Sequence, residues 1–193
     1  MKHRSKFLVI VDDSEELEVA VRFVSRRAAS TKGGIVLLKI IEHHDPQHWQ
    51  SVEEIILQEA RDEAEEKLKK WAKVINDLNG ITPELSVKEG IASEKIVEVL
   101  EEDDAVRFLV LAASSGEKPG PLVTLLAGQK SGKLPVPIVI VPQNLSDEAI
   151  DGARKISLSE AKATVVAKSS AKPWLNWANL FAVTGANKIK SAH

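Results

Sequence analysis

The sequence predicts an α/β protein with an open parallel sheet and helices on both of its faces. Residues 7–11 and 35–41 are apolar at nearly every position, as in strands that are covered on both faces. Shorter apolar runs at 85–87, 107–112 and 138–141 alternate with segments that suit helices. Because strands that alternate with helices connect through right-handed crossovers, we expect the five strands to run parallel in one sheet.

The segments between the strands show helical spacing of apolar residues. The first helix is predicted from the recurrence of Leu17, Ala20, Val21, Val24 and Ala28. A long helix is predicted over residues 51–79, with one apolar stripe formed by Ile56, Ala60, Ala64, Leu68, Trp71, Ile75 and Leu78. Shorter helices are predicted at 93–102 and at about 122–128.

Composition excludes several classes of protein. The chain contains no cysteine, which excludes a disulfide framework, a thiol nucleophile and a zinc–thiolate site. The basic N-terminus leads into a short apolar run, and no stretch approaches the roughly 18 apolar residues of a membrane span. The formal net charge of -2 argues against nucleic-acid binding. We therefore expect a cytoplasmic protein that binds no nucleic acid.

Polar residues follow two of the buried strands at the point where each strand ends. Asp12, Asp13 and Ser14 come directly after the first strand, and a small polar loop at 113–120 follows the fourth. Ligands of open α/β sheets bind at the carboxyl ends of the strands, where the strand order reverses. The sequence therefore predicts a ligand crevice that includes Asp12. The alternative is that Asp13 or Ser14 only caps the next helix.

Three histidines lie close together in the loop that follows the second strand. His43, His44 and His48 could bind a metal, but Pro46 would break a helix that aligned two of them. We interpret them as polar loop residues, and Trp49 as a side chain that packs on the next helix.

Residues from about 6 to 144 resemble the universal stress protein family. The resemblance rests on the first strand with its acidic turn, Val11-Asp12-Asp13-Ser14, and on the second strand, Leu37-Leu38-Lys39-Ile40. It also rests on Val87-Lys88-Glu89-Gly90, on Ala113-Ser114-Ser115-Gly116, and on the closing strand from Pro135 to Val141. It implies the strand order 3-2-1-4-5, and a homodimer through the fifth strand, Ile138, Val139, Ile140 and Val141.

In one branch of the family, the resemblance implies bound ATP, with Mg²⁺ only together with the nucleotide. That branch carries G-x2-G-x9-G-[ST] after the fourth strand, and this chain departs from the motif. Ala113 stands at the first glycine, and Gly128 comes two residues late and is followed by Gln129. By resemblance, Asp12 contacts the base or ribose and Ile40 contacts adenine. The candidate nucleotide-binding residues are Val11, Asp12, Asp13, Ser14, Ile40, Ala113, Ser114, Ser115, Gly116, Lys118 and Gly120.

Two functions therefore stay open. The chain is a stress-response regulator that binds ATP or another adenine nucleotide, or it is a dimeric interaction module of the same fold without a nucleotide. Phosphoacceptor receiver chemistry would need an Asp after the third strand and a Lys after the fifth, where this chain has Glu89-Gly90 and Pro142. No nucleophile elbow is present, so we expect no enzyme activity beyond weak ATP hydrolysis.

Residues 151–193 differ in charge from residues 1–150. They carry seven basic and two acidic side chains in a chain whose net charge is -2, which predicts a separate basic tail. Residues 162–172 have the composition of a linker, and Pro173 could open a helix that gathers Trp174, Trp177 and Phe181 on one face. Contact with a membrane or a protein partner, docking onto the acidic domain, and disorder are the alternatives for this tail.

Overall fold

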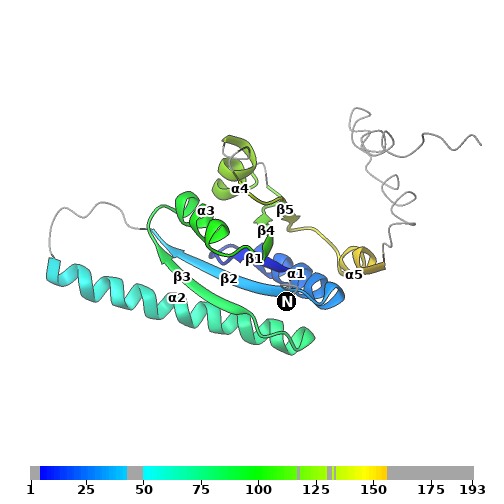
Figure 1. Ribbon diagram of the computed structural model, residues 1–193, viewed down its shortest axis with the longest axis horizontal. Helices are drawn as coiled ribbons and strands as arrows, with labels where there is room; N and C mark the ends of the chain where they lie inside the picture. Colours follow the sequence, from blue (N-terminus) through cyan, green and yellow to red (C-terminus); the bar gives the residue numbers. More distant parts are fainter. Residues whose placement is uncertain (1–4, 43–49, 117, 130–131, 133, 156–193) are drawn as a thin grey trace, which may run out of the picture. The chain divides into compact units, whose positions relative to one another are not determined.

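The computed structural model describes residues 5–42, 50–116, 118–129, 132 and 134–155. Strands and helices alternate along the described chain (Figure 1). In order, the elements are β1 (Lys6–Ile10), α1 (Leu17–Thr31), β2 (Gly34–Ile41), α2 (Gln50–Asn79), β3 (Glu84–Glu89), α3 (Ala92–Glu102), β4 (Val106–Ala113), α4 (Pro121–Thr124), the π-helical turn η1 (Leu125–Gln129), β5 (Ile138–Pro142) and α5 (Asp147–Lys155).

The five strands form one sheet in the order β3-β2-β1-β4-β5, and every neighbouring pair is parallel. This confirms both the fold class and the strand order expected from the sequence. The chain moves from β1 outward to β2 and β3, and then returns to the other side of β1 for β4 and β5. The strand order therefore reverses between β1 and β4.

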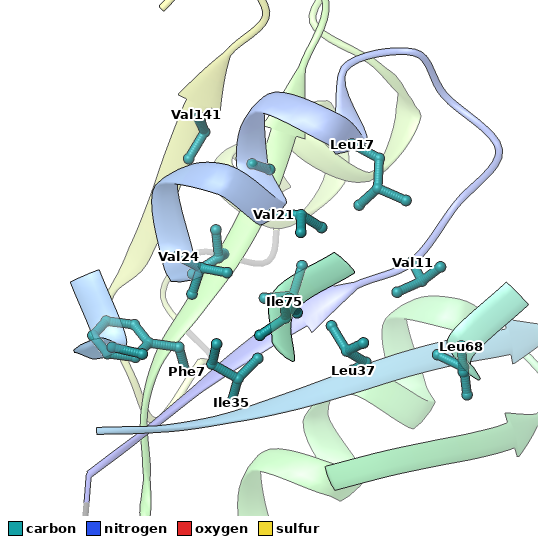
Figure 2. Packing of buried hydrophobic residues seen from close by; sticks show 14 residues of the cluster. Phe7, Val11, Leu17, Val21, Val24, Ile35, Leu37, Leu68, Ile75 and Val141 are labelled. Atoms are coloured by element: carbon teal, nitrogen blue, oxygen red, sulfur yellow. The ribbon is translucent and has the colours of Figure 1, made fainter. Parts of the chain in front are cut away.

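The apolar strands pack on both faces of the sheet. One face of the sheet packs against α1 and α2 (Figure 2). From β1, this face presents Phe7 and Val9, and Val11 follows just after the strand ends. On the other face, Leu8 and Ile10 pack with residues of α3, α4 and η1. Successive side chains of a strand point to opposite faces, so a strand covered on both faces is apolar at every position.

Helix α2 differs from the prediction at both ends of its apolar stripe. Ala64, Leu68 and Ile75 are buried, but Ile56 is 59% exposed and Leu78 is 44% exposed. The cause is length. A helix of 30 residues extends about 45 Å, whereas a strand of eight residues, such as β2, extends about 26 Å. The sheet can therefore cover only part of the stripe.

Two further elements depart from the sequence analysis. The helix expected at 122–128 is a four-residue α-helix followed by a π-helical turn. Helix α5 was not predicted. It packs through Ile150, which is 2% exposed, and its Asp147 and Asp151 pair with Arg22 and Arg26 of α1.

Several predictions fall outside the described residues. They include the interpretation of the three histidines and of Trp49, and the tail beyond residue 155. Helix α5 continues past residue 150 to Lys155, and residues 1–154 form one compact unit. No described helix is long and apolar enough to cross a membrane.

Candidate functional site

A cavity of about 340 Å³ opens at the carboxyl ends of β1 and β2, beside the end of β4. The first residues of α3, together with α4 and the start of η1, form its other wall. Its lining residues are Ile10, Val11, Asp12, Lys39, Ile40, Glu42, Ile91, Ala92, Ser93, Ala112, Gly120, Pro121, Leu122, Val123 and Leu125. The cavity therefore lies where the strand order reverses, which is the place predicted for a ligand crevice.

Asp12 brings a carboxylate to the cavity from the end of β1. Its Oδ1 accepts hydrogen bonds from the backbone N–H of Ser14 at 3.1 Å and from Ser14 Oγ at 2.6 Å. This turn between a carboxylate and the residue two positions later is common after strands and fixes the side chain locally. Helix α1 begins only at Leu17, and its N-cap residue, Glu16, makes no side-chain cap hydrogen bond. The interpretation of Asp13 or Ser14 as the helix cap is therefore wrong.

Asp13, the residue after Asp12, makes its contacts away from the cavity. Its carboxylate pairs with Lys67 of α2 at 2.7 Å and with Lys39 of β2 at 3.1 Å. The hydrogen bond from Lys67, and then that from Lys39, lowers the pKa of Asp13 below its usual value. Asp13 thus ties the end of β1 to β2 and α2, and it is not among the residues that line the cavity.

The walls of the cavity are largely apolar. Ile10 and Ile40 lie at the ends of β1 and β2, and Leu122 and Val123 of α4 contribute to another wall. Ile91, which precedes α3, also lines the cavity and is 60% exposed. Apolar walls with a few convergent polar groups are typical of small-molecule sites.

The polar side of the cavity joins the end of β2 to the start of α3. Glu42 Oε1 accepts a hydrogen bond from the backbone N–H of Ala92 at 3.1 Å, so a carboxylate satisfies one of the first amides of the helix. Ser93, the next residue of α3, also lines the cavity, and it is 2% exposed. Among the described residues, no group of three acidic, histidine or cysteine side chains could hold a metal ion.

Two backbone donors of the loop after β4 are bound within the protein. The N–H of Gly116 donates to Ser114 Oγ at 3.2 Å. The hydroxyl of Ser115 donates to Gln143 Oε1 at 3.0 Å, and the N–H of Ser115 donates to the same oxygen at 3.4 Å. At the other end of the loop, Gly120 has a φ of 103°, which favours glycine, and it lines the cavity.

The family model for the universal stress protein family matches residues 3–131. The chain belongs to the universal stress protein family. The resemblance to this family is thereby confirmed over the matched residues, which include the acidic turn, whereas the closing strand at 135–141 lies beyond them. A comparison with curated proteins found no match.

Solved structures of other universal stress proteins share the fold. A universal stress protein from Lactobacillus plantarum is 12% identical, with a TM-score of 0.58 over 73% of this chain and 99% of that one. A family member from Arabidopsis thaliana with AMP bound is 14% identical, with a TM-score of 0.52 over 75% and 94%. A universal stress protein in complex with cAMP is also 14% identical, with a TM-score of 0.52 over 74% and 100%.

The cavity of this universal stress protein brings together Val11, Asp12, Ile40 and Gly120 of the predicted site residues. Asp13 and Ser14 make the contacts given above and lie outside its lining. Other predicted residues also lie outside the lining, and they belong to the loop after β4: Ala113, which is buried, together with Ser114, Ser115, Gly116 and Lys118.

Sequence reasoning missed Lys39 and Glu42 at the end of β2, and it missed the contributions of α3 and α4 to the cavity. Glu42 carried a signal, because it is the first carboxylate after a strand that was correctly predicted. Ile91, Ala92 and Ser93 carried none, because nothing in their residue types links them to a strand end that is 50 positions earlier. Only the parallel pairing of β2 with β3 brings the start of α3 to that edge.

Proposed function

We propose that this universal stress protein binds an adenine nucleotide in the cavity between the ends of β1 and β4, and acts as a nucleotide-dependent regulator in the stress response. The observation that carries the proposal is the position of Asp12. Its carboxylate lies at a largely apolar cavity, at the point of the sheet where ligands of α/β proteins bind.

The dimensions and chemistry of the cavity suit the base and ribose of such a ligand. Its volume of about 340 Å³ is comparable with the lower end of the roughly 300–1,000 Å³ of small-molecule sites. Apolar side chains such as Ile40 and Leu122 offer surfaces on which a flat base can pack. The Asp12 carboxylate is an acceptor for a ribose hydroxyl or an amino group, and Oδ2 is not used by the turn with Ser14.

The relatives with bound ligands support the choice of an adenine nucleotide. The Arabidopsis thaliana protein holds AMP, and another universal stress protein holds cAMP. Both ligands combine an adenine, a ribose and one phosphate.

The second candidate is a dimeric interaction module that binds no nucleotide. It is favoured by two backbone amides of the loop after β4, which already donate to Ser114 of that loop and to Gln143 after β5. The same amides would be donors to phosphate in a glycine-rich anion loop.

Nucleotide release and calorimetry distinguish the two candidates. The purified full chain is denatured and the supernatant is analysed for adenine nucleotide, and nucleotide-free protein is then titrated with AMP. We expect saturable binding of AMP, and Asp12→Ala should weaken it by about 1–3 kcal/mol because a hydrogen bond to the ligand is not made.

Ser14→Ala is the matched control for that experiment. It removes the Ser14 hydroxyl that donates to Asp12 but keeps the carboxylate, so its affinity for AMP should stay close to that of the wild type. Absence of both released nucleotide and binding heat would favour the interaction module. Equal losses in the two variants would show that Asp12 acts only through its turn.

A further inference from the structure

We infer that the cavity selects the nucleoside end of its ligand and discriminates against polyphosphates, so that adenosine and AMP bind more tightly than ATP. The inference rests on the proposed adenine site and specifies its substrate class. Its basis is that carboxylates lie at the site, while two amides of the loop after β4 and the first amide of α3 already donate to side chains of the protein.

Carboxylates lie at the cavity and at the loop beside it. Asp12 and Glu42 line the cavity itself. Glu16 lies at the loop after β4, where its own backbone amide and then the hydroxyl of Ser114 lower the pKa of its carboxyl. Glu16 is therefore ionised at neutral pH. Each additional phosphate of a bound nucleotide would bring further negative charge toward these groups.

The amides that could offset that repulsion have partners within the protein. Gly116 N–H donates to Ser114 Oγ, and Ser115 N–H donates to Gln143 Oε1. A phosphate that took their place would have to break these hydrogen bonds and would leave the side-chain oxygens to find new donors. These two amides of the loop are therefore already hydrogen-bonded within the protein.

The first residue of each of the two helices that border the cavity offers no free backbone N–H. The backbone N–H of Ala92, the first residue of α3, donates to the Glu42 carboxylate. Helix α4 begins with Pro121, which has no N–H to donate. The first position of each helix therefore supplies no donor to an anion.

Lys39 is the cation among the described lining residues, and its amine is bound on the other face of the sheet. Lys39 is two residues after Leu37, so both side chains project from the face of β2 that packs against α1 and α2. There its Nζ donates to Asp13 Oδ2 at 3.1 Å. The Lys39 amine is therefore already paired with a carboxylate of the protein.

Titration of the full chain with adenosine, AMP and ATP, without divalent cations and at low ionic strength, tests the inference. We expect adenosine and AMP to bind at least about threefold more tightly than ATP, a ratio in the range of partly exposed charge interactions, and the ratio should shrink as salt is added. Affinity for ATP that equals or exceeds the affinity for adenosine would overturn the inference.

A pair of adjacent variants identifies the charge that discriminates. Glu16→Gln should raise the affinity for ATP by about two- to fivefold and leave the affinity for adenosine within about twofold of the wild type. Glu15→Gln, which makes the same change of net charge at an exposed neighbour, should leave the ratio of the two affinities unchanged. Identical ratios in the two variants would contradict the role given to Glu16.

The outcomes separate the inference from the proposed function. If none of the three compounds binds, the adenine site itself is wrong and the inference falls with it. If all three bind and ATP binds most tightly, the adenine site stands and only the discrimination against polyphosphates is wrong.

Discussion

Two adjacent carboxylates at the end of β1 have different tasks. Asp12 lies at the cavity and is held by the turn to Ser14, whereas Asp13 pairs with Lys39 and Lys67. The sequence indicated that carboxylates belong at this strand end, and it did not distinguish the two. The distinction depends on where α2 places Lys67, which is 54 positions away in the chain.

The paired state of Asp13 predicts a pH-dependent contribution to stability. Its pKa in the folded protein is below the ordinary value, so the stabilisation is present above the unfolded pKa of roughly 4 and is lost as the pH falls through the folded pKa. Because the Asp13 side chain is 66% exposed, Asp13→Asn should lower the free energy of unfolding by at most about 1 kcal/mol at pH 7.

Urea denaturation of Asp13→Asn and the wild type at several pH values measures this effect. We expect the difference in unfolding free energy to shrink as the pH falls below the unfolded pKa of roughly 4 and through the lower folded pKa of Asp13. Asp77→Asn, at an exposed position near the end of α2, makes the same change of residue type and is the control, and it should cost less than Asp13→Asn at pH 7. A difference for Asp13→Asn that is the same at pH 3 and pH 7 would contradict the ion pairs.

At the scale of the elements, α1 and α2 are joined by a polar contact within their apolar interface. Asn79 Nδ2, at the end of α2, donates to Ser25 Oγ at 2.6 Å, and Ser25 is fully buried in α1. Asn79→Ala should lower the free energy of unfolding by about 1–2 kcal/mol, because it leaves a buried hydroxyl without this donor.

Chemical denaturation of three variants checks that contact. Asn76→Ala removes an exposed amide from the same turn of α2 and should cost less than Asn79→Ala. The double variant Ser25→Ala with Asn79→Ala should recover part of the loss, since it removes both partners. Equal costs for Asn76→Ala and Asn79→Ala would show that the hydrogen bond contributes little to docking of the two helices.

The elements could be predicted from sequence where a periodic apolar pattern defined them. Strands β1 and β2 and helices α1, α2 and α3 appear within one or two residues of their predicted bounds. Helix α5 was missed although its start carried a signal. Ser146 Oγ accepts from the N–H of Ala149, and Asp147 and Glu148 follow it, as at many helix starts.

The region between β4 and β5 could not be predicted in the same way. Gly120 directly precedes α4 and Pro121 begins it, and the π-helical turn of η1 that follows has no sequence pattern that distinguishes it from an α-helix. This region forms one wall of the cavity, so the least predictable element is also one that shapes the site.

At the scale of the whole molecule, the alternation of strands and helices predicted a parallel sheet, and the family resemblance supplied its order. Only part of the candidate site could be predicted from the sequence. Asp12, which adjoins a strand end, could be placed at the crevice by the switch-point rule, and Ile40 was placed there by the family resemblance. The residues at the start of α3 reach the cavity only because β2 pairs with β3, and local sequence patterns do not predict that pairing.

The edge strand β5 leads to a prediction about assembly. It ends the sheet formed by the described strands, and Ile140 on it is 43% exposed. An apolar strand edge favours pairing with another chain. We predict a homodimer through β5, with Ile140→Lys shifting the protein toward the monomer in equilibrium sedimentation at micromolar concentration.

The opposite edge of the sheet provides the control for assembly. Leu85 of β3 is also 43% exposed, and Leu85→Lys should leave the dimer intact. A wild-type protein that is monomeric at micromolar concentration, or a dimer that only Leu85→Lys disrupts, would contradict the assignment to β5.

The most direct test of the central claim is to map AMP binding on the backbone amide resonances of the full chain. We predict saturable shifts at Asp12, Ile40, Ala92 and Leu122, which line the cavity at the strand switch point. A second hollow of about 400 Å³, lined by Arg26, Ala29, Ser30 and Asn79, is an internal control and should show none. Shifts confined to that hollow, or no shifts at saturating AMP, would contradict the assignment of an adenine nucleotide site to the cavity.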